Sequence, residues 1–108
     1  MDPSDEPAAA DRTSGRTPAE LAAKRVLQAF FRDGRLVSIP ARQGKRLVVL
    51  RELRERCFVE DRDYPEKEVN MRLALVHPDV AALRRYLVDA QLMTRSNGIY
   101  RRRPDADG

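Results

Sequence analysis

The chain has 108 residues with a formal net charge of +4; 35% of them are charged, 42% hydrophobic and 6% aromatic. This length allows one small domain with a modest core, and no apolar run approaches the roughly 20 residues of a membrane span. A single cysteine and a single histidine exclude an internal disulfide and a His/Cys metal cage within one chain. We therefore expect a cytoplasmic protein with no bound metal or cofactor and no membrane contact.

The two ends of the chain differ from its middle. Residues 1–17 and 104–108 are net acidic and lack large apolar side chains after Met1, so they are predicted to be disordered tails around a domain at 18–103. The basic surplus lies in that domain, and 18 of the 21 basic residues are arginines. One explanation is a high-GC genome, which produces the same arginine bias. The other explanation is an acidic partner, first of all nucleic acid.

The first half of the domain predicts a helix, a short strand and a second helix. The sequence TPAE at 17–20 has the composition of a capping box with proline in the first turn, and it predicts a helix that reaches about residue 32. Asp33 and Gly34 are expected to end that helix, with Gly34 in the left-handed conformation. Residues 36–39 predict a short strand, and 43–57 a helix whose buried stripe includes the inert thiol of Cys57.

The second half predicts two helices and a hairpin. A loop at 60–64 is expected before a helix over 65–76, which has two acids in its first turn, where the helix dipole favours them. The last helix is predicted over 79–91. Asn97 and Gly98 then stand between two short β-prone runs, which is a strong hairpin signal.

The resulting order, α-β-α-α-α-β-β, is mainly helical with a small β-hairpin and resembles a winged helix-turn-helix. In this interpretation 65–76 is the supporting helix, 79–91 the recognition helix and 95–103 the wing. Any three-helix core followed by a hairpin needs similar apolar spacing, so the pattern is only moderately specific.

A closer resemblance covers roughly residues 27–102. The blocks FFRDGRL at 30–36 and YPEKEVN at 64–70, together with a closing segment from Asp79 to Arg101, are similar to the bacterial domain-of-unknown-function family 2087. The resemblance implies a winged-helix-like domain of a transcriptional regulator. Some members of that family carry the domain behind a separate repressor-type helix-turn-helix, which is equally compatible with sensing or dimerisation.

Candidate DNA-contacting residues gather in the closing segment, which holds six arginines and one acid between residues 84 and 103. A helical projection places Arg85 on the outer face and Arg84 on the flank, where an ion pair with Glu66 or Glu68 is the alternative role. Few base-reading donors occupy the first turn of the last helix, so contact with phosphates is expected rather than sequence readout. The predicted DNA-binding set is Arg84, Arg85, Arg95, Asn97, Arg101, Arg102 and Arg103.

The sequence thus predicts a non-enzymatic, transcription-associated domain that binds double-stranded DNA. An enzyme is not expected, because one histidine and one cysteine provide no nucleophile–base pair. The alternative is a protein-interaction or dimerisation module that forms a homodimer or joins a partner regulator without touching DNA. RNA is a third option, although the low aromatic content offers few surfaces for base stacking. The final arginines also fit a merely solubilising end of the domain.

Overall fold

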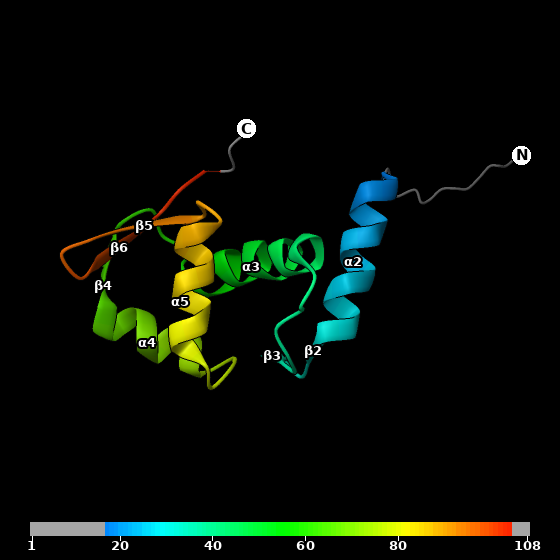
Figure 1. Ribbon diagram of the computed structural model, residues 1–108, viewed down its shortest axis with the longest axis horizontal. Helices are drawn as coiled ribbons and strands as arrows, with labels where there is room; N and C mark the ends of the chain where they lie inside the picture. Colours follow the sequence, from blue (N-terminus) through cyan, green and yellow to red (C-terminus); the bar gives the residue numbers. More distant parts are fainter. Residues whose placement is uncertain (1–16, 105–108) are drawn as a thin grey trace, which may run out of the picture.

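The computed structural model describes residues 17–104 (Figure 1). The predicted disorder of residues 1–16 and 105–108 lies outside this range. The described helices are α2 (Pro18–Phe30), α3 (Gln43–Cys57), α4 (Glu66–Ala74) and α5 (Val80–Asp89). The described strands are β2 (Phe31–Arg32), β3 (Arg35–Leu36), β4 (Asp63–Pro65), β5 (Met93–Ser96) and β6 (Ile99–Arg102).

The strands form two small antiparallel sheets. β2 pairs with β3, and a three-stranded sheet has the order β4-β6-β5. In Figure 1, α3 crosses the middle of the molecule, with α4, α5 and the three-stranded sheet around one end and α2 beside the other. The predicted combination of a mainly helical chain with a small C-terminal hairpin is confirmed.

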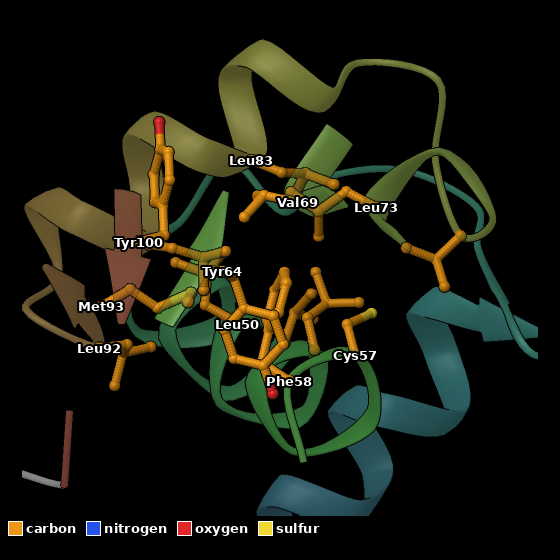
Figure 2. Close-up of a cluster of buried hydrophobic side chains, with 14 of the residues drawn as sticks. Leu50, Cys57, Phe58, Tyr64, Val69, Leu73, Leu83, Leu92, Met93 and Tyr100 are labelled. Atoms are coloured by element: carbon orange, nitrogen blue, oxygen red, sulfur yellow. The ribbon is translucent and has the colours of Figure 1, made fainter. Parts of the chain in front are cut away.

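The core lies where α3, α4 and α5 meet the three-stranded sheet (Figure 2). One leucine from each helix, Leu53, Leu73 and Leu83, is fully buried there. Burial of each such side chain contributes about 1.5–3 kcal/mol relative to leaving it in water. Tyr100 of β6 is also buried, so the apolar side of the hairpin closes the core as well.

An aromatic pair links the end of α3 to β4. The rings of Phe58 and Tyr64 meet edge to face, with centroids 5.1 Å apart. The Tyr64 hydroxyl donates to the Glu60 carbonyl at 2.7 Å and accepts from the Glu60 amide at 3.0 Å. These two bonds satisfy the hydroxyl of a tyrosine that is fully buried.

Several local predictions are confirmed. Thr17 and Glu20 form the capping box, with the Glu20 amide donating to Thr17 Oγ1 at 3.1 Å and the Thr17 amide donating to Glu20 Oε1 at 2.7 Å. Asn97 and Gly98 turn the β5–β6 hairpin with φ angles of 52° and 75°. Cys57 is buried at the end of α3.

The prediction for residues 31–39 is only partly confirmed: Gly34 is left-handed and Leu36 lies in a strand, but the helix end and the bounds of the strand are wrong. Asp33 and Gly34 do not cap α2; they form the turn of a second hairpin, with φ angles of 54° and 77°. Phe31 and Leu36 pair across this hairpin, and Leu36 is buried, whereas Val37 is exposed and lies outside any strand. An Asp-Gly pair suits both a helix end and a tight turn, and here burial of Leu36 against the domain favours the turn.

The predicted loop at 60–64 contains part of a strand, which is a second correction. β4 pairs with β6, and Tyr64 lies opposite Tyr100. Because Tyr64 is the only apolar side chain from 60 to 64, the sequence shows no alternation there, and the strand depends on its tertiary partner. α4 and α5 are both shorter than predicted, and Pro65 precedes α4 instead of opening it. Within residues 17–104, no helix is long and apolar enough to cross a bilayer.

Candidate functional site

A shallow cleft lies between α5 and the β5–β6 hairpin, with the first residue of α4 at its edge. Its volume is about 440 Å³, and we call it the α5–hairpin cleft. Three of the seven predicted DNA-binding residues, Arg84, Arg85 and Arg95, line it together. The fold therefore brings the helix and hairpin arginines to one surface.

Arg84 connects α5 to α4. Its guanidinium donates to the side-chain oxygen of Asn70, and its Nη1 lies 4.0 Å from Glu66 Oε2. These contacts give Arg84 the alternative role expected from the sequence, pairing with a carboxylate at the edge of the core. They also give Asn70 a hydrogen-bond partner inside a helix, where asparagine is otherwise unfavourable.

Glu66 also binds the hairpin. Its Oε1 accepts from Arg95 Nε at 3.3 Å and from the Tyr100 hydroxyl at 3.3 Å. Burial raises the pKa of Tyr100 above its ordinary value, so this hydroxyl is a protonated donor at neutral pH. Glu66 thus holds α5, β5 and β6 together through one carboxylate.

Arg101 pairs with the segment that enters β4. Its Nη1 lies 3.0 Å from Asp63 Oδ1, and its Nη2 lies 3.4 Å from Asp61 Oδ1. About half of the Arg101 side chain remains exposed. An exposed pair of this kind contributes about 0–1 kcal/mol, so the arginine can exchange its carboxylates for another anion at little cost.

Arg102 has a different environment, with a side-chain exposure of 19%. Its Nη2 donates to both oxygens of Glu55, at 3.0 and 2.8 Å. Its Nη1 donates to the carbonyls of Phe58 and Val59, at 2.7 and 3.0 Å. Burial raises the pKa of Glu55, but hydrogen bonds from Arg102 and Arg54 outweigh it and bring that pKa below its ordinary value. Arg102 therefore fastens β6 to the end of α3.

The remaining predicted residues stay on the surface. Arg85 is exposed, with its guanidinium carbon 5.5 Å from the centre of the Tyr86 ring. Asn97 is exposed at the tip of the hairpin, and Arg103 follows β6 with an exposed side chain. Within residues 17–104, neither Arg85 nor Arg103 forms an ion pair. Among the predicted DNA-binding residues, these two are the arginines whose charge no described carboxylate offsets directly.

Two arginines outside the predicted set have structural contacts. Arg54 is 5% exposed, and its Nη1 donates to the Arg103 carbonyl at 2.5 Å. Arg62 lies 4.0 Å over the ring of Tyr64 and donates to Glu68 at 2.6 Å. Both lie in charged stretches that predict only solvated surface, and partners so distant in sequence leave no local signal.

The cysteine and the histidine of the chain both have structural surroundings in the described residues. Within 17–104, no group of three His, Cys, Asp or Glu side chains is placed to hold a metal ion. Burial raises the pKa of Cys57, so it stays a protonated thiol inside the core. The imidazole Nδ1 of His77 accepts the Asp79 amide at 3.0 Å, a capping contact before α5.

Comparison with known proteins gives one finding. No curated protein and no solved structure matches the chain significantly. A family model matches residues 35–102, from β3 to the end of β6, so the matched region includes both α4–α5 and the hairpin. The chain belongs to DUF2087, a family described as uncharacterized proteins conserved in bacteria.

Proposed function

We propose that this domain is a winged helix that binds the phosphate backbone of double-stranded DNA, as a non-enzymatic part of cytoplasmic transcription regulation. The observation that carries the proposal is the chain topology. The order α3-β4-α4-α5-β5-β6, with the sheet arranged β4-β6-β5, agrees with the order expected of a helix-turn-helix followed by a wing, and this agreement supports the proposal. On this proposal α5 would be the recognition helix and β5–β6 the wing.

The ion pairs divide the predicted DNA-binding arginines into three groups. Arg85 and Arg103 carry charges with no described carboxylate partner. Arg95 and Arg101 are about half exposed in pairs that a phosphate can replace. Arg84 and Arg102 are largely buried, and their contacts belong to the folded domain. Two to four phosphate contacts are therefore expected, and binding should fall in the range of non-specific complexes, roughly 10⁻⁴ to 10⁻⁶ M at physiological salt.

The first turn of α5 limits sequence readout. Ala81 and Ala82 carry no hydrogen-bonding side chain, and the Asp79 carboxylate accepts the Ala82 amide at 3.2 Å. Donors at the start of a recognition helix normally contact base edges. We therefore expect little discrimination between duplexes of different sequence.

Fluorescence anisotropy with a labelled duplex, titrated between about 50 and 200 mM salt, tests the proposal. Each phosphate neutralised contributes about 0.9 to the log–log slope, so wild type should show a slope of about −2 to −4. The double variant R85A/R103A should lose up to about 1.8 of this slope. The matched control R25A/R32A removes the same charge from α2 and β2, near the other end of the molecule (Figure 1).

The control variant should retain nearly the full slope. Equal effects of the two double variants would show that binding depends only on the net charge of the protein and that the predicted arginines form no DNA interface. Absence of binding into the high micromolar range at low salt would refute DNA binding altogether.

A second candidate function, a dimerisation module without DNA binding, is favoured by the outer face of α4. Met71 of α4 and Leu75, which immediately follows the helix, lie four residues apart and are 62% and 71% exposed. They line an apolar depression that ends at Pro65. Large exposed side chains clustered in this way are typical of contact surfaces.

Sedimentation of the protein without DNA distinguishes the two functions. A dimerisation module should gain mass with concentration, and M71S/L75S should abolish that gain while the domain stays folded. A monomer at all concentrations would refute the second candidate and leave the DNA-binding proposal unaffected.

A further inference from the structure

A second pocket, of about 290 Å³, lies between the first turns of α3 and the last turn of α5. We call it the α3–α5 pocket. It is separate from the α5–hairpin cleft, with which it shares only Asp89. Its volume is at the lower limit for sites that enclose small molecules, which restricts any occupant to the size of a metabolite.

Apolar groups line the inner side of this pocket. Leu50 is buried, Leu47 and Ala90 are half-buried, and the ring of Tyr86 forms a further part of the wall. Such a surface accepts an aliphatic side chain and excludes water from it. The polar groups that border the pocket then determine which end of a ligand lies where.

Arg46 provides a positive charge at a fixed place. Its Nη1 donates to the carbonyls of Pro40 and Ala41 at 3.3 and 2.9 Å, and its guanidinium carbon lies 4.4 Å over the centre of the Tyr86 ring. Within residues 17–104, no carboxylate pairs with it. Because only neutral groups contact this guanidinium, no counter-charge offsets its positive charge. Its planar N–H edge suits a carboxylate.

Asp89 provides a negative charge on the α5 side of the same pocket. It is exposed, and no cation in the described part of the chain pairs with it. It ends α5, where the helix dipole disfavours an acid, just as Arg46 lies in the first turn of α3, where the dipole disfavours a base. Each charge is therefore unfavourably placed for its own helix, and no ion pair between the two relieves this.

We propose that the α3–α5 pocket binds a free α-amino acid with an aliphatic side chain. The carboxylate would bind Arg46, the ammonium group would bind Asp89, and the side chain would lie against Leu47, Leu50 and Tyr86. A zwitterion satisfies both charges at once, whereas an anion or a cation satisfies only one. This inference does not depend on DNA binding.

Three ligands that differ only in charge test the assignment on the full-length wild-type chain. L-leucine carries both charged groups, 4-methylpentanoate lacks the ammonium group and 3-methylbutylamine lacks the carboxylate. In a titration followed by two-dimensional amide NMR, leucine should shift signals from the first turn of α3 and from residues 86–91. Each truncated ligand should bind about ten- to a hundredfold more weakly, the usual effect of losing one charged hydrogen bond.

Variants then assign each charge. R46Q should weaken leucine and 4-methylpentanoate alike, whereas D89N should weaken leucine and leave 4-methylpentanoate unchanged. R42Q is the matched control, because Arg42 immediately precedes α3 but does not line this pocket. It should bind leucine as wild type does.

The proposal is overturned if leucine shifts none of these signals at about 20 mM, or if the three ligands bind the wild type equally. Equal weakening of leucine binding by R42Q and R46Q would also overturn it, because the loss would then reflect only the overall positive charge near the start of α3. The ligand series on the wild type decides the question even if R46Q fails to fold.

Discussion

Replacing Arg102 with alanine tests whether one of the predicted DNA-binding arginines stabilises the fold. The substitution removes two hydrogen bonds to Glu55 and two to the carbonyls of Phe58 and Val59. Hydrogen bonds to charged groups contribute about 1.5–3 kcal/mol when shielded, and the partial exposure of Glu55 lowers its share. We expect R102A to lower the free energy of unfolding by about 2–3 kcal/mol.

The matched comparison is R101A, on the same strand and with the same loss of charge. Its partners, Asp61 and Asp63, are mostly exposed, so its cost should stay below about 1 kcal/mol. Urea denaturation measures both, and the midpoint should move while the slope of the transition stays constant. Equal costs for the two variants would refute the division between a structural Arg102 and an exchangeable Arg101.

Three further outcomes follow from particular contacts. Hydrogen bonds from Arg62 and Arg72 hold the pKa of Glu68 below its ordinary value of 4.5. The ionised Glu68 side chain therefore contributes fully to stability above that pH, and the contribution is lost as the pH falls through the folded-state pKa. The variant E68Q should flatten this part of the curve of stability against pH. Cys57 should react slowly with a thiol reagent in the native protein and quickly in denaturant, and fast native labelling would place it outside the core. G98A should lower the free energy of unfolding by about 1 kcal/mol, because Gly98 has a left-handed φ of 75°. A Cβ at this position meets nothing within 4 Å, so the backbone conformation alone accounts for the cost. The control N97G should leave the melting temperature unchanged.

The sequence predicted those elements whose signals are local. The capping box at Thr17, the buried face of α3 and the Asn97–Gly98 turn each depend on residues within one or two turns of chain. β4 could not be found in this way, because its one buried side chain, Tyr64, has no alternating apolar neighbours. Asp33 and Gly34 allow two conformations, and only the pairing of Phe31 with Leu36 selects between them.

The candidate site was less predictable than the fold, because an arginine's charge is effective only where no carboxylate offsets it. Arg95 meets Glu66 from 29 residues away, and Arg102 meets Glu55 from 47 residues away. The six arginines from 84 to 103 suggest a strongly basic surface, yet four of them face carboxylates from α3, α4 or the β4 segment. Tertiary pairing, which composition does not encode, thus reduces the surface charge available to a partner.

Glu66 offers a test in which stability and DNA binding change in opposite directions. Its carboxylate binds Arg95 and Tyr100 and lies 4.0 Å from Arg84 Nη1, at the start of α4, where the dipole favours an acid. E66Q should therefore destabilise the domain by about 1 kcal/mol.

The same substitution removes a negative charge from the α5–hairpin cleft and frees Arg95 for a phosphate. If the cleft contacts DNA, affinity should rise and the salt slope should steepen by up to about 0.9. E20Q is the control, because it removes an acid from the first turn of α2 and also costs stability, but lies at the far end of the molecule (Figure 1). A less stable E66Q with unchanged DNA affinity would mean that Glu66 serves the fold alone and that the cleft is not the interface. An equal gain of affinity in E20Q would assign the effect to net charge.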